Sequence, residues 1–269
     1  MTIRPILFAI ALSAFGQTPR PELSISVNGR RNPEVRRGAP VLVRLVLMHS
    51  GRLNRAANVP ELQLAPQGSA WADAVRLRVR DRLGAEKPWG YSLVVRPEQP
   101  ALVLPHRAWV AVEWTLSESE GAFLEPGDYQ IEAVLEVSNS PGWNGEAVSV
   151  PAIVRITESA QASEPQQASE AVLRAVLLMR KGATSEAVVL MDELLLKQPK
   201  SVRALQLRAE LAEKAGDIHL ALMFANRALD AAQMTYSDPG KGLLSLILLR
   251  DRLYGRLLDP LAPTAGVLP

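Results

Sequence analysis

The sequence contains no cysteine among its 269 residues. This absence excludes disulfide bridges, thiolate metal sites, cysteine nucleophiles and the cysteine anchor of a bacterial lipoprotein. The charge is nearly balanced, with 30 basic and 28 acidic side chains and a formal net charge of +2. Long-range attraction to nucleic acid requires a clear basic excess, so the composition argues against a nucleic-acid partner.

Residues suited to catalysis or metal binding form no known motif. The three histidines, His49, His106 and His219, are far apart and show no metal-ligand spacing. The sequence has no nucleophile elbow, phosphate-binding loop or dinucleotide-binding fingerprint. The acidic segment 117–128 could offer calcium ligands, but its spacing fits no EF-hand loop, and a solvated loop is the favoured interpretation. We therefore expect no enzyme, no cofactor and no metal.

The N-terminus has the layout of a secretory signal peptide. Residues 1–16 place Arg4 before a short apolar run, and Ala14 and Gly16 form a small-x-small cleavage site. The apolar run is too short to span a bilayer, and the alternative interpretation is a buried strand. We expect a bacterial protein that is periplasmic or secreted, without a transmembrane span once the signal is removed.

Composition divides the rest of the chain into two halves. Residues 158–169 are mostly Ala, Ser, Gln, Glu and Pro, which predicts a flexible linker. All five tryptophans precede this segment, whereas alanine and leucine dominate after it. We expect one domain over 17–157, a second over 170–259, and a disordered tail over 260–269.

The first half alternates apolar and polar residues, with turn-forming Asn-Gly and Pro-Gly pairs between the runs. This pattern predicts antiparallel strands with one wet face. The segment 124–137, with Tyr129 just after a Pro-Gly turn, resembles the tyrosine corner of immunoglobulin-like and fibronectin-like domains. The resemblance implies an all-β immunoglobulin-like sandwich in which the Tyr129 hydroxyl bonds to backbone a few residues upstream.

The second half repeats the same residue at an interval of 34 in four places. The pairs are Gly182 and Gly216, Ala175 and Ala209, Ala187 and Ala221, and Leu195 and Leu229. This spacing resembles the tetratricopeptide repeat family. The resemblance implies an all-α domain of helical hairpins, with alanines where helices cross and glycines where a side chain would crowd the turn.

The leucine-rich segment 242–259 follows the second repeat. A helix that caps the repeats is the favoured interpretation, because two hairpins leave an apolar face uncovered. A surface for homo-oligomers is the next alternative, and contact with a membrane is a more remote one.

Two functions from different classes follow. The repeat resemblance implies an adaptor or assembly protein that binds protein partners along one helical face, at Arg203, Gln206, Glu210 and Glu213. The alternative is a module that binds a surface or cell-wall glycan through loop aromatics and a basic strand face. Its candidate ligand-binding residues are Trp89, Tyr91, Trp143, Arg76, Arg78 and Arg80.

Overall fold

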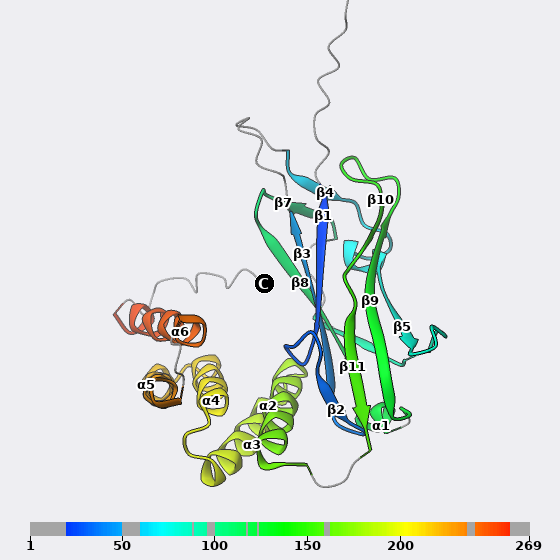
Figure 1. The fold of residues 1–269 in the computed structure, drawn as a ribbon. Coiled ribbons are helices and arrows are strands. Elements are labelled where there is room, and N and C mark those ends of the chain that lie inside the picture. The colour runs from blue at the N-terminus through cyan, green and yellow to red at the C-terminus, as the bar shows by residue number, and fades with distance from the viewer. Residues whose placement is uncertain are drawn as a thin grey trace, which may run out of the picture.

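The chain forms a β-rich region followed by a helical region (Figure 1). The computed structural model describes residues 20–49, 60–87, 89–95, 100–116, 118–122, 124–158, 162–235 and 240–258. The expected signal peptide over 1–16 and the expected tail over 260–269 lie outside these residues.

Two sheets of the β-rich region pack face to face. The first has the order β1-β3-β8-β6, with β1 Pro21–Val27, β3 Val41–His49, β8 Trp109–Leu116 and β6 Ser92–Val95. The second has the order β10-β9-β11-β2, with β10 Gly145–Val148, β9 Gly127–Val137, β11 Ala152–Thr157 and β2 Glu34–Arg36. Strand β5 (Val75–Asp81) pairs with the other edge of β9.

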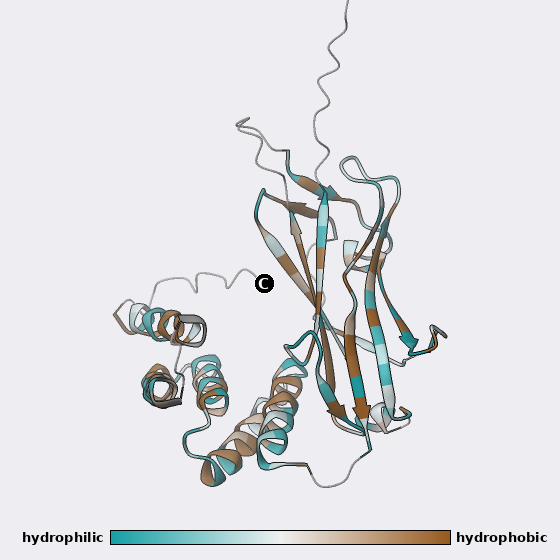
Figure 2. Cartoon of the chain, viewed as in Figure 1, coloured by the Kyte–Doolittle hydropathy of each residue, from teal (hydrophilic) through white to brown (hydrophobic). Residues whose placement is uncertain are grey.

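Alternation along the strands builds the core between these sheets. In β3, Val43 and Leu45 are buried, whereas Arg44 between them points outward. Figure 2 shows hydrophobic and hydrophilic bands alternating along the strands. Strand β8 departs from the rule, because Glu113 on its outward face is buried as well. An arginine of the helical region covers that carboxylate, as described below.

The expected fold class, an all-β immunoglobulin-like sandwich followed by a tetratricopeptide-like repeat domain, is wrong in that form. The β-rich region has a third sheet, formed by β4 (Leu62–Leu64) and β7 (Leu102–Leu104). It also contains the 3₁₀ turn η1 (Trp71–Ala74) and the short helix α1 (Glu118–Gly121). Strand β2 runs parallel to β11. Alternation predicts which segments are strands, but it carries no information on which strands pair.

The described residues of the helical region form five helices. They are α2 Glu164–Arg180, α3 Thr184–Lys197, α4 Val202–Lys214, α5 Ile218–Thr235 and α6 Gly240–Leu258. Helices α2 and α3 pack as one pair, α4 and α5 as a second, and α6 packs on α5. The four repeated alanines are fully buried in the shared core, as expected for positions where helices cross.

The glycines between paired helices have a different cause from the one expected. Gly182 and Gly216 have φ angles of 82° and 85°, a left-handed conformation that favours glycine. Apart from the two adjacent residues of the chain, a Cβ atom at either position would meet no described atom within 4 Å. Backbone conformation therefore explains these glycines, and the expected crowding of the turn is wrong.

Helix α2 begins inside the expected linker. Ser163 is its N-cap residue, and the backbone N–H of Ser163 donates to Gln166 Oε1 at 3.1 Å. Pro165, which the composition placed in a flexible segment, lies in the first helical turn, where its missing N–H has no helical partner to lose. Residues 164–169 are therefore helical.

Helix α2 also joins the two regions through ion pairs. Glu170 accepts from Arg36 of β2, with Nη2 to Oε2 at 2.5 Å. Arg174 pairs with Glu118 of α1, and Arg180 Nη2 lies 3.3 Å from Glu113 Oε2 in β8. The buried apolar residues form two separate clusters, one in each region. Polar contacts therefore hold α2 beside the β-rich region (Figure 1).

Candidate protein-binding face

Four polar side chains form a row along α4. Arg203, Gln206, Glu210 and Glu213 are spaced three or four residues apart and so share one side of the helix. The other positions of α4 supply the buried residues Ala204, Leu205, Leu207, Ala209, Leu211 and Ala212. Because these apolar residues pack α4 between α3 and α5, they fix the direction of the polar row.

Helix α6 meets the C-terminal end of this row. Arg252 Nη2 donates to Glu213 Oε2 at 2.6 Å, and Arg256 Nη1 donates to Glu213 Oε1 at 3.2 Å. Each carboxylate oxygen thus has its own arginine. The sequence places the two arginines one turn apart on α6, but helical spacing alone does not indicate that they face α4.

Glu210 lies at the centre of the row and is half-buried. Burial raises the pKa of Glu210, and the nearby charge of Glu213 adds to the effect. A hydrogen bond from Gln206 Nε2 to Glu210 Oε1 at 3.0 Å and the charges of Arg252 and Arg180 act in the opposite direction. The net shift is upward, so desolvation outweighs the attraction.

Gln206 of α4 therefore contacts Glu210, and the charges of Arg252 on α6 and Arg180 on α2 act on it. We call this surface the α2–α4–α6 face, defined by Arg180, Arg203, Gln206, Glu210, Glu213, Arg252 and Arg256. It continues to the β-rich region, because Arg180 pairs with Glu113, whose other oxygen lies 3.7 Å from Arg44 Nε. Glu113 Oε2 has no hydrogen bond within the part of the chain that the structure describes, so its contact with Arg180 is an ion pair without hydrogen-bond alignment.

The arginine row of β5 is matched by acidic side chains. Arg76 lies 3.5 Å from Glu136, and Arg78 and Arg80 lie 3.7 Å and 3.5 Å from Glu132. Both glutamates belong to β9, the strand that pairs with β5. These cross-strand pairs offset much of the basic charge that the glycan alternative requires.

The loop aromatics of the same alternative are mostly core residues. Trp89 and Trp143 are only 9% and 8% exposed, and Trp89 packs edge-on against Tyr129. The partly buried Tyr91 donates its hydroxyl to the Leu77 carbonyl at 2.8 Å. Trp109 is not among the residues chosen for the glycan alternative, yet it is 47% exposed on the outer face of β8. The alternation of residues along a strand does not indicate whether another element covers its outward face.

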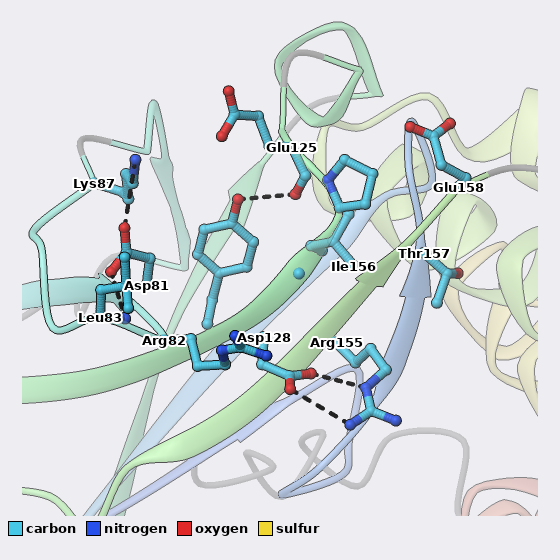
Figure 3. Close-up of a pocket in the computed structure, with 13 residues that line it drawn as sticks. Asp81, Arg82, Leu83, Lys87, Glu125, Asp128, Arg155, Ile156, Thr157 and Glu158 are labelled. Carbon is cyan, nitrogen blue, oxygen red and sulfur yellow. Dashed lines mark hydrogen bonds and ion pairs between the residues drawn. The ribbon is translucent and has the colours of Figure 1, made fainter.

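A pocket of about 620 Å³ lies at one end of the β-rich region (Figure 3). Its charged residues are largely paired with each other, as Arg155 donates to Asp128 at 2.7 Å and Lys87 lies 3.5 Å from Asp81. The hydrogen bond from Arg155 lowers the pKa of Asp128. Within this pocket the Tyr129 hydroxyl donates to the Glu125 carbonyl at 2.8 Å, which is the hydrogen bond expected from the sequence.

The fold brings His49 and His106 together, with ring centroids 5.5 Å apart, although they are distant in the sequence. His219 is separate and exposed on α5. Among the described residues, no group of three or more histidine, aspartate or glutamate side chains is placed to hold a metal ion. None of the described helices is long and apolar enough to cross a membrane.

Comparison with known proteins gives no family. No family model and no curated protein matches the chain. A solved structure of a family 123 glycoside hydrolase from Clostridium perfringens is similar over 54% of this chain, with 9% identity and a TM-score of 0.30. The chain spans 29% of the length of that structure. A likeness of this degree carries no conclusion about fold or activity.

Proposed function

We propose that this chain is an exported, non-catalytic adaptor that binds a protein partner on the α2–α4–α6 face. The observation that carries the proposal is the row of polar side chains on α4, in which the half-buried Glu210 lies between Gln206, its hydrogen-bond donor, and Glu213, which two arginines of α6 hold. The repeated glycines, both in left-handed turns after the first helix of a pair, support a region built from repeated helical pairs. Helical repeats present extended binding surfaces of this kind.

The glycan alternative has less support. It needs free aromatic rings and free basic charge on the β-rich region. Trp89 and Trp143 are buried, and the arginine row of β5 is ion-paired with β9. The residues chosen for that alternative are thus engaged in the fold itself.

A second copy of the chain is the partner that we propose for α6. Leu244 and Leu248 on its outer side are 57% and 60% exposed. No helix covers this side within the described residues, whereas α2 and α4 each have a paired helix. We expect size-exclusion chromatography with light scattering to detect a dimer that Leu248→Lys dissociates, and a monomeric wild-type chain would contradict this.

Affinity capture from a cell-envelope extract of the producing bacterium tests the adaptor function. The baits are the full chain, the double variant Arg203→Glu/Glu210→Arg, and the control Glu186→Arg/Lys197→Glu on exposed positions of α3. Each double variant preserves net charge. We expect one defined protein to be retained by wild type and control and lost from the α4 variant. Equal capture by all three baits, or by none, would contradict the proposal.

A further inference from the structure

Most charges of the α2–α4–α6 face already have a partner. Arg252 and Arg256 both donate to Glu213, and Arg180 pairs with Glu113 in the β-rich region. Arg203 is exposed and has no ion pair among the described residues. Glu210 and Arg203 are therefore the two charges of this face that can form new ion pairs.

Glu210 is poorly satisfied as a hydrogen-bond acceptor. An ionised carboxylate offers about four acceptor positions, and here one neutral amide, that of Gln206, donates to it. Arg180 and Arg252 act on Glu210 only through their charge, without a hydrogen bond among the described contacts. A half-buried carboxylate in this state gains more from an incoming cation than an exposed one does.

We infer that Glu210 selects the partner by pairing with a lysine or arginine side chain of a bound peptide segment. This inference rests on the proposed function of the α2–α4–α6 face. It assigns Glu210 as the specificity-determining residue, and it makes Gln206 a positioning residue that holds the carboxylate through Nε2.

The position of Arg203 adds a second element to the expected partner. Arg203 precedes Glu210 by seven residues, which is about 10 Å along the axis of a straight helix. In a polyproline II segment, side chains three residues apart lie on the same side and about 9 Å apart. An acidic residue three positions from the basic one would therefore reach Arg203. The expected motif pairs a lysine or arginine with an aspartate or glutamate at that spacing.

Selection from a random 12-residue peptide library displayed on phage tests this inference. The baits are the full chain, Glu210→Gln, Glu210→Lys, and the control Glu186→Lys on α3. We expect wild type and control to enrich peptides with a basic residue. Glu210→Gln should weaken a selected peptide about 10- to 100-fold, because a hydrogen bond between charged groups is lost. Glu210→Lys should enrich acidic residues instead.

The outcomes separate the inference from the proposed function. If wild type enriches peptides without a basic preference, or if Glu210→Gln binds them unchanged, the role of Glu210 is refuted while the adaptor function stands. If wild type enriches no peptide at all, both are refuted. Circular dichroism of each variant shows whether the helices are intact, and Glu210→Gln alone decides the question if Glu210→Lys does not fold.

Discussion

The ion pair between Arg36 and Glu170 is predicted to hold the helical region against the β-rich region. Arg36 Nε and Nη2 each reach a different oxygen of Glu170, at 3.2 Å and 2.5 Å, and the side chains are 29% and 13% exposed. Fully exposed pairs contribute about 0.2–1 kcal/mol, whereas hydrogen bonds to charged groups contribute about 1.5–3 kcal/mol. The pair of Arg36 and Glu170 has two hydrogen bonds and is partly buried, so its contribution should lie between these two ranges. We therefore expect a coupling free energy of about 1–2 kcal/mol.

A double-mutant cycle in urea measures this coupling. The variants are Arg36→Glu, Glu170→Arg and the swapped double variant. All five tryptophans lie in the β-rich region, so tryptophan fluorescence follows that region, while ellipticity at 222 nm follows mainly the helices. Each single variant should shift the helical transition to lower urea and leave the fluorescence transition nearly unchanged. The swapped variant should recover at least half of the loss.

Two results would refute this reasoning. The first is a pair of single variants that unfold like the wild type, which would mean that the ion pair contributes nothing to docking. The second is a double variant whose loss equals the sum of the two single losses, because an additive cycle shows that the residues do not interact. High salt should reduce the coupling, but only in part, since a half-buried pair is screened less than an exposed one.

Three further predictions concern single residues. Tyr129→Phe should lower the free energy of unfolding by about 1 kcal/mol, measured by tryptophan fluorescence in urea, because the Glu125 carbonyl loses its donor. Gly216→Ala should destabilise the helices by about 1–2 kcal/mol because φ is positive there, whereas Gly255→Ala within α6 should stabilise them by up to about 1 kcal/mol. Thermal melts followed at 222 nm test this pair, because the melting temperature should fall for Gly216→Ala and rise for Gly255→Ala. Glu210→Gln should raise the melting temperature at pH 8, and by less at pH 4, because the pKa of Glu210 is raised on folding and its ionisation then opposes the folded state. A variant less stable than wild type at pH 8 would contradict the last of these.

The helical region could largely be predicted from the sequence. Residues 34 positions apart occupy equivalent packed sites in the two helical pairs, since Ala175 and Ala209 are both buried where helices meet. The start of α2 was missed because the composition of 158–169 resembles a linker, although Ser163 and Gln166 form a capping pair that was visible in the sequence. Helical spacing predicts the row on α4, but it does not indicate the partners of this row on α6, because the direction of those side chains depends on how α6 packs.

The β-rich region was less predictable. Strands such as β3 and β9 follow from their alternation, but the third sheet and the parallel contact of β2 with β11 depend on pairing between distant segments. The same limit explains the tryptophans. Trp89 lies in a loop and is buried, whereas Trp109 lies in a strand and is exposed, because burial depends on which elements cover each position.

Site-specific photocrosslinking in the producing bacterium tests the central claim most directly. A photoreactive amino acid is placed at the exposed Arg203 of the α2–α4–α6 face, where it leaves the hydrogen bond between Gln206 and Glu210 in place, and in a second strain at Lys197 on α3. The account predicts one discrete protein adduct from position 203, none from position 197, and a weaker adduct from position 203 when Glu210→Gln is added. Adducts of equal strength from both positions, or none from position 203, would contradict it.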